Sequence, residues 1–177
     1  MDFYQVIQTR RSVRRYLRKE IPRQILERIL EAARQAPSGN NRQPWHFIVV
    51  QEAALKEKIA AACYEQSFVR DAAAVIVACG QKYPNPYQPL GDNCYLIDVT
   101  IAVDHLILAA RNEGLGSCWV GAFHPEPIKK LLGIPAGLTV VMVVPLGYPE
   151  SETCFHSGSS RKPLSEIVSR EQYGRKT

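Results

Sequence analysis

The stretch DNCYLIDVTIAVDHLILAARNE (residues 92–113) predicts the longest helix of the chain, and the glycine directly after it is a residue that commonly ends helices. In a helix of 3.6 residues per turn, the apolar side chains of this stretch fall on nearly every side. They are Tyr95, Leu96, Val99, Ile101, Val103, Leu106, Ile107 and Leu108. A helix that is apolar around its circumference has to be buried on all sides, which a 177-residue chain can hardly achieve alone. We therefore expect a second subunit to cover part of this helix.

The segments on both sides of this helix alternate between helix and strand patterns. Helices are predicted for residues 2–9, 22–35, 53–63, 125–132 and 163–171, and strands for residues 46–50, 72–80, 117–123 and 138–147. In the first helix, Asp2 is placed to cap the N-terminus, and Val6 and Ile7 form the apolar side. Three prolines in residues 81–91 predict an irregular loop. The sequence predicts one α+β domain, residues 1–177, with a single sheet.

The composition is that of a soluble globular protein. Hydrophobic residues make up 46% and charged residues 22%, and no apolar run reaches the roughly 18–20 residues of a membrane span. The N-terminal residues lack the order of a secretory signal. The five cysteines form no CxxC pair and mostly lie in apolar runs, so we expect reduced, buried thiols. A cytoplasmic protein that has no membrane segment is therefore expected.

The positive charge of the chain is concentrated in one segment. The net charge is +5, and six of the 22 Lys and Arg residues lie in residues 10–19, RRSVRRYLRK, which contain no acid. Nucleic-acid binding usually needs basic residues spread along a face, so this function is not expected. A compact cluster suits a compact anion such as a cofactor phosphate, although a solvated, salt-bridged arm is an equally good interpretation of the charge alone.

Four segments are too polar or too unusual for simple packing. Extended backbone through RRSVR (10–14) would point Arg10, Ser12 and Arg14 to one side, where guanidinium and hydroxyl groups could bind an anion. PSGNNRQPW (37–45) is a rigid polar loop that could present amides to a planar heterocycle, or could simply connect a helix to a strand. GLGSCWVGAF (114–123) offers a backbone that a flat ligand could approach, or a strand with a bulge. SGSSRKP (157–163) brings two cations before a helix, and is equally typical of a surface loop.

Common catalytic signatures are absent from the sequence. HExxH, GxSxG, GxxxxGK[ST] and GxGxxG do not occur, so a zinc protease, an α/β-hydrolase, a P-loop enzyme or a Rossmann dinucleotide site is not expected. The four histidines are scattered, and we expect none of them to bind a metal.

Taken together, the segments RRSVR (10–14), PSGNNRQPWHF (37–47), GLGSCWVGAF (114–123) and SRKPLSEIV (160–168) resemble the nitroreductase family of FMN-dependent, NAD(P)H-oxidising enzymes. The resemblance extends over nearly the whole chain, and residues 98–114 look like the central dimer helix of that family. It implies an α+β homodimer with a central, mainly antiparallel sheet flanked by helices. Two FMN sites would lie at the subunit interface, each built from both chains.

The resemblance also implies roles for individual residues. Arg10 and Ser12 would hold the FMN phosphate with Arg11 nearby, Arg161 would close over it, and Arg14 would face the N1–C2 carbonyl edge of the flavin as a tuning cation. From the other subunit, the flavin would be lined by Pro37, Ser38, Gly39, Asn41 and Gln43. The backbone of Val120, Gly121 and Ala122 would border the reactive ring edge. Ser159 replaces a lysine found in many relatives, and residues 65–68 match no family pattern.

The function implied by this resemblance is a ping-pong oxidoreductase. NAD(P)H would pass hydride to the flavin and leave, and a small electron-poor acceptor, such as a nitroaromatic or a quinone, would then take its place. No side chain is needed as a nucleophile or general base. The alternatives are a specialised FMN enzyme of the same fold, which oxidises a ring or cleaves flavin, a non-catalytic flavin carrier, and a small nucleic-acid binder.

Overall fold

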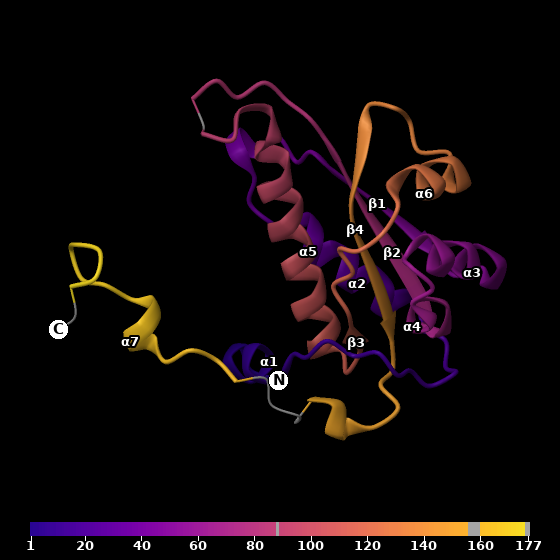
Figure 1. Cartoon of the computed structure of the whole chain (residues 1–177). Helices are drawn as coiled ribbons and strands as arrows, with labels where there is room; N and C mark the ends of the chain where they lie inside the picture. The colour runs from indigo at the N-terminus through magenta and orange to yellow at the C-terminus, as the bar shows by residue number, and fades with distance from the viewer. Residues whose placement is uncertain (88, 156–159, 176–177) are drawn as a thin grey trace.

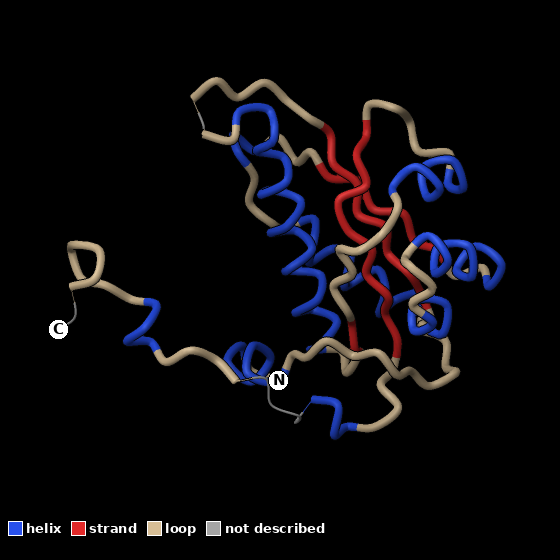
Figure 2. The backbone as a smooth tube through the Cα atoms, in the orientation of Figure 1, coloured by secondary structure: helices blue, strands red, loops and turns tan. Residues whose placement is uncertain are grey.

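A four-stranded antiparallel sheet forms the centre of the molecule. The computed structural model describes residues 1–87, 89–155 and 160–175. The strands are β1 (Trp45–Val50), β2 (Ala74–Gln81), β3 (Gly116–Ser117) and β4 (Leu138–Gly147), in the order β1-β2-β4-β3 (Figure 2). Every neighbouring pair is antiparallel, so the predicted α+β fold with an antiparallel sheet is confirmed.

Helices cover both faces of this sheet (Figure 1). One layer contains α2 (Arg23–Arg34) and α5 (Tyr95–Asn112), and the other contains α3 (Ala53–Ala62), α4 (Ser67–Asp71) and α6 (Pro125–Leu132). The side chains of β2 alternate between the two layers, since Ala74, Ile76 and Ala78 pack with α5 while Val75, Val77 and Cys79 pack with α3 and α6. Four of the five cysteines are buried, in agreement with the expectation of buried thiols.

The helix α5 packs closely on β2 because Gly80 has no side chain. A Cβ atom at Gly80 would lie 2.5 Å from Cδ2 of Tyr95 and 2.9 Å from Cγ2 of Val99. The opposite side of α5 leaves Leu96 and Ile97 exposed, at 38% and 46% of their surface. The segment Gly91–Asn112 is long and apolar enough to cross a membrane, but half of it is buried in the domain, as in a core helix. One side of the predicted all-round apolar helix is therefore uncovered in a single chain.

The N-terminal helix α1 (Phe3–Thr9) begins at the predicted capping residue. The Asp2 carboxylate accepts a hydrogen bond from the Gln5 N–H, and the Gln5 side chain accepts one from the Asp2 N–H. On the predicted apolar side of this helix, Val6 is buried, whereas Ile7 is 46% exposed in a single chain. The helix contacts α5, where the Arg111 side chain donates a hydrogen bond to the Thr9 hydroxyl (3.0 Å).

The predicted strand 117–123 is much shorter than expected. β3 contains only Gly116 and Ser117, and a single further bridge joins Val120 to Val143. The reason lies in β4, where Pro145 accepts a hydrogen bond from the Cys118 N–H (3.3 Å) but has no N–H to return one. The ladder is interrupted there and resumes only at the bridge between Val120 and Val143.

The C-terminal segment differs most from its prediction. The expected helix 163–171 is reduced to α7 (Leu164–Ile167), and residues 160–175 are exposed throughout. This tail leads away from the body of the domain (Figure 1). A helix this short is not stable without tertiary packing, and a single chain offers it none. The short helix α4 was not predicted from the sequence.

Candidate functional site

Residues 10–17 run along the edge of the sheet as an added, irregular strand. The Val13 N–H donates to the Ser117 carbonyl (2.9 Å), and the Leu17 N–H donates to the Tyr148 carbonyl (2.9 Å). Val13 is buried against Gly116, where a Cβ would lie only 2.6 Å from the Cβ of Val13. The absence of a side chain at this glycine lets the basic segment lie directly against the sheet.

Arg10, Ser12 and Arg14 surround the buried thiol of Cys118. Burial raises the pKa of that thiol, while the charges of Arg14 and Arg10 and a hydrogen bond from Ser12 lower it. The Arg14 guanidinium lies 5.7 Å from the ring centre of Phe68, above its face. In the part of the chain that the structure describes, no carboxylate forms an ion pair with Arg10 or Arg14. The edge of the sheet therefore carries two guanidinium groups that no described carboxylate neutralises, with the Ser12 hydroxyl, which is bonded to the Cys118 thiol, between them.

Arg11 has a different environment from its neighbours. Its Nη1 donates to the carbonyls of Gln8 (2.7 Å) and Arg10 (2.8 Å), which ties the side chain to the end of α1. Arg11 is thus positioned beside Arg10 but is partly used in holding the local backbone.

The backbone after Cys118 is open to solvent. Val120 is buried by its bridge to Val143, whereas Gly121 and Ala122 are exposed, and a Cβ added at Gly121 would meet nothing within 4 Å. The Gln66 side chain donates to the Ala122 carbonyl (3.3 Å) and to the Cys63 carbonyl (2.7 Å). The segment is held from one side and leaves free space on the other.

The polar loop at residues 37–43 is exposed and conformationally unusual. Asn40, Asn41 and Gln43 all have positive φ, at 50°, 55° and 51°. Asparagine tolerates this left-handed region, but glutamine is found there less often, and such conformations persist only when surrounding contacts hold them. Here the Ser38 Oγ accepts from the Gln43 N–H (2.9 Å), and the Gln43 side chain donates to the Asn41 carbonyl (3.1 Å). Pro37 lies at the exposed start of this loop.

The same loop is attached to the helix α5. The Gly39 N–H donates to Oδ1 of Asp98 (3.1 Å), and the Tyr83 hydroxyl donates to Oδ2 (2.7 Å). Burial, followed by this hydrogen bond, raises the pKa of Tyr83 to about 12. Asp98 and Tyr83 were not predicted as site residues, because in the sequence they belong to a helix pattern and to an irregular loop.

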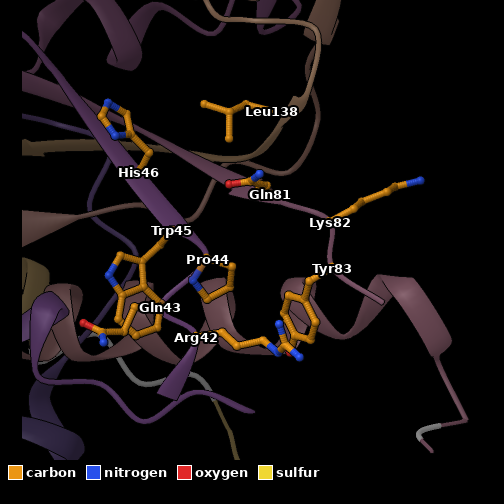
Figure 3. Close-up of a pocket in the computed structure, with 9 residues that line it drawn as sticks. All are labelled: Arg42, Gln43, Pro44, Trp45, His46, Gln81, Lys82, Tyr83 and Leu138. Carbon is orange, nitrogen blue, oxygen red and sulfur yellow. The ribbon is translucent and has the colours of Figure 1, made fainter. Parts of the chain in front are cut away.

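A surface pocket of about 460 Å³ opens beside this loop (Figure 3). Its wall includes Gln43, the aromatic residues Trp45 and Tyr83, and the basic side chains of Arg42 and Lys82. The other lining residues are Pro44, His46, Gln81 and Leu138. The pocket thus combines flat aromatic side chains with positive charge, and it lies where β1 begins and β2 ends.

The two halves of the predicted site lie at opposite ends of α5. The loop 37–43 contacts Asp98 in the first turn of α5, while residues 12–13 pair with Ser117, just beyond its last turn. An 18-residue helix is about 27 Å long at 1.5 Å per residue, so one chain does not bring these groups together.

The last predicted site residue, Arg161, lies on the exposed tail. Its Nη1 donates to the Ser160 carbonyl at 3.4 Å, and the structure does not place it in the group of Arg10, Ser12 and Arg14. Ser159 and the rest of residues 156–159 lie outside the described residues. Among the described residues, no cluster of His, Cys, Asp and Glu could hold a metal ion.

Comparison with known proteins decides the family. The family model described as "Nitroreductase family" matches residues 7–96 and 64–148, which together span well over half of the chain. This chain belongs to the nitroreductase family. The nitroreductase resemblance drawn from the four sequence segments is thereby confirmed.

Nitroreductase family members from several organisms are similar over nearly their full length. A relative from Archaeoglobus fulgidus, provisionally named an NADH dehydrogenase/NAD(P)H nitroreductase, is 38% identical over 165 residues, which cover 89% of this chain and 91% of the relative. A solved nitroreductase family protein from Clostridium novyi NT has a TM-score of 0.81 and 34% identity, covering 99% of this chain and 96% of that one. A solved FMN-dependent nitroreductase from Clostridium difficile R20291 has a TM-score of 0.76 and 26% identity, covering 84% and 88%.

The exposed groups of this nitroreductase family chain fit a flavin mononucleotide. Guanidinium forks and a hydroxyl suit a phosphate, and the open space at Gly121 suits the approach of a flat ring. Gln66 and Phe68, to which the sequence analysis assigned no role, join this site by holding Ala122 and stacking under Arg14. No local pattern marks them, because their position follows from the packing of α4 on the sheet.

Proposed function

We propose that this chain is an FMN-dependent oxidoreductase that uses NAD(P)H to reduce a small, electron-poor acceptor, such as a nitroaromatic or a quinone. We further propose that it works as a cytoplasmic homodimer. The observation that carries the proposal is the group formed by Arg10, Ser12 and Arg14 at the Cys118 thiol, three residues before the open backbone of Gly121. These groups lie together at the sheet edge, and no described carboxylate pairs with either of the two guanidinium groups.

Phosphate binding is assigned to the N-terminal segment. Arg10 and Ser12 would donate to the phosphate oxygens, and Arg11, held at the end of α1, would add positive charge nearby. Arg161 would reach the same phosphate from the C-terminal tail. Because the tail in one chain extends away from the domain, this contact requires the tail to pack on the dimer.

The second half of the cofactor site is assigned to a partner chain. Pro37, Ser38, Gly39, Asn41 and Gln43 would line the flavin held by the other subunit. Three features support this arrangement: the loop lies about one helix length from the basic segment, the outer side of α5 is uncovered, and the tail exposes apolar residues. The exposed apolar residues of the tail are Leu164 (73%), Ile167 (63%) and Val168 (51%).

Bound FMN supplies hydride acceptance from NAD(P)H and electron delivery to the acceptor, in two successive half-reactions. Arg14, fixed over Phe68, would place a positive charge at the pyrimidine edge of the ring and stabilise negative charge there. The backbone of Val120, Gly121 and Ala122, held by Gln66, would border the reactive edge and leave room for the donor and the acceptor in turn. No side chain is assigned as a nucleophile or general base.

The direct test is an absorption spectrum of the purified protein, recorded before and after anaerobic addition of NADH and of NADPH, together with its mass in solution. A flavin spectrum that bleaches with either nucleotide, in a particle of twice the chain mass, is expected. A colourless monomer that stays colourless after incubation with FMN would contradict the proposal. Bound flavin that no nucleotide reduces would instead indicate a non-catalytic flavin carrier.

A further inference from the structure

Asp98 is the one carboxylate buried in the part of the chain that the structure describes, with 5% of its surface exposed. It lies in the first turn of α5, where the helix dipole favours a negative charge. A buried carboxylate is costly unless hydrogen-bond donors satisfy it. Its two oxygens have one donor each: the Gly39 N–H at 3.1 Å and the Tyr83 hydroxyl at 2.7 Å. The carboxylate therefore joins three segments that are distant in sequence.

The geometry around Tyr83 leaves little freedom for these segments. A Cβ added at Gly39 would lie 3.0 Å from the Tyr83 hydroxyl oxygen, so the tyrosine packs where the glycine has no side chain. The Arg42 guanidinium, which belongs to the same polar loop, lies 4.8 Å from the ring centre of Tyr83, above its face (Figure 3). The loop thus touches the tyrosine at two places, and the carboxylate holds the tyrosine from α5.

The loop that these contacts hold has a backbone that needs support. Three of the four residues after Gly39 have positive φ, and local hydrogen bonds hold the part between Ser38 and Gln43. The bond from the Gly39 N–H to Asp98 is the loop's attachment to a rigid helix. Without it, the loop would keep its internal turn but lose its place relative to α5.

We infer that Asp98 is the positioning residue of the flavin-lining loop, residues 37–43. Tyr83, which comes from the 81–91 segment, holds the same loop in place through its contacts with Asp98 and Arg42. This inference rests on the proposed function, since residues 37–43 are assigned there to the flavin of the partner subunit. Asp98 would then act across the dimer. It would fix the position of the loop in its own chain, and that loop would complete the cofactor site of the partner subunit. It also gives the 81–91 segment a role, which is to deliver the tyrosine.

The test compares Asp98→Ala with Asp98→Asn. Alanine removes both hydrogen bonds, whereas asparagine can still accept from the Gly39 N–H and donate to the Tyr83 hydroxyl oxygen. Asp71→Asn is the matched control, because that aspartate is exposed on α4 in the other helix layer. For each variant, the hydrogen exchange of the amides of residues 38–43 is measured without FMN, and the FMN dissociation constant is measured by flavin fluorescence.

We expect Asp98→Ala to exchange the Gly39 amide at least tenfold faster, with the β2 amides unchanged, and to bind FMN about tenfold more weakly. Asp98→Asn should recover most of both values, and the control should match the wild type. Unchanged exchange in residues 37–43 of Asp98→Ala would overturn the inference. Faster exchange with unchanged FMN affinity would overturn it too, since the loop would then be positioned for something else.

A second variant covers the case in which Asp98→Ala does not fold. Tyr83→Phe keeps the ring under Arg42 and removes only the hydroxyl, so it should speed exchange of the Gly39 amide about threefold and weaken FMN binding by a similar factor. Wild-type values for both quantities would overturn the inference. If the wild-type protein bound no FMN at all, the proposed function would fail and the flavin role of Asp98 with it, while the exchange data would still show whether Asp98 holds the loop.

Discussion

The direction of Arg10, Ser12 and Arg14 follows from one short stretch of extended backbone. Val13 between them is buried against Gly116, so its neighbours lie on the other side of the extended backbone, where all three interact with the Cys118 thiol. Alternation of side chains along extended backbone is a local property, which is why the sequence predicted this group. The partners of the group come from other elements, and the sequence did not reveal them.

At the residue scale, Arg10→Ala should weaken FMN binding. A hydrogen bond from a guanidinium to a phosphate contributes about 1.5–3 kcal/mol, so the dissociation constant should rise about 10- to 150-fold. Arg18→Ala, a loss of the same charge in the same basic segment, is the control and should change the constant much less. Titration of the apoprotein with FMN measures both, and equal effects of the two variants would contradict a specific phosphate contact.

Arg14→Ala should leave FMN bound but change its chemistry. The guanidinium over Phe68 is assigned to the pyrimidine edge, where its charge stabilises the reduced flavin. Without that charge, the midpoint potential should fall and turnover should slow. Spectroelectrochemical titration and steady-state NAD(P)H oxidation measure these two quantities, and an unchanged potential would show that Arg14 does not tune the flavin.

The buried thiols predict a loss of stability in alkali. Burial raises the pKa of Cys63 and of Cys79 from 9.0 to about 11. Between pH 9 and 11 the unfolded chain has released these protons and the folded chain has kept them, so the free energy of unfolding should fall as the pH rises. Urea unfolding at several pH values measures the slope. Replacing both cysteines by alanine should reduce the dependence of the unfolding free energy on pH. An equally strong dependence in that variant would show that other groups cause the effect.

At the scale of elements, the contact between α5 and β2 sets the position of Asp98. Local periodicity predicted both elements within a few residues, but it did not show that Gly80 lets them approach so closely. Periodicity also missed the end of β3, because the missing N–H of Pro145 acts across the sheet and not along the chain. The position of a helix or strand can thus be predicted where its own residues determine it, but not where a residue of a neighbouring strand ends it.

Gly80→Ala should destabilise the domain by about 1–3 kcal/mol, because the new methyl group would overlap the Tyr95 ring and Val99. Gly137→Ala is a matched control, since a Cβ there would meet nothing within 4 Å. Thermal and urea unfolding of the two variants give the comparison. Similar stabilities would show that α5 can shift on the sheet at little cost.

At the scale of the whole molecule, the separation of the two half-sites along α5 makes a prediction about mixed dimers. One chain would carry Arg10→Ala and the other Asn41→Ala, each on its own affinity tag. In a site shared between chains, one of the two sites of the mixed dimer contains neither substitution. Half of the FMN should then bind with wild-type affinity, although both variant homodimers bind weakly. Uniformly weak binding in the mixed dimer would place the whole site within one chain.

The α+β pattern, the caps and turns, the extended basic segment and the family motifs could all be predicted from the amino-acid sequence. These features depend on residues that are neighbours in the chain, and hydrophobic period, capping and turn chemistry are all local. Two features could not be predicted in this way: the loop 37–43 and the basic segment lie at opposite ends of α5, and Asp98 joins that loop to Tyr83. Such distances depend on how helices pack on a sheet, which no single segment specifies.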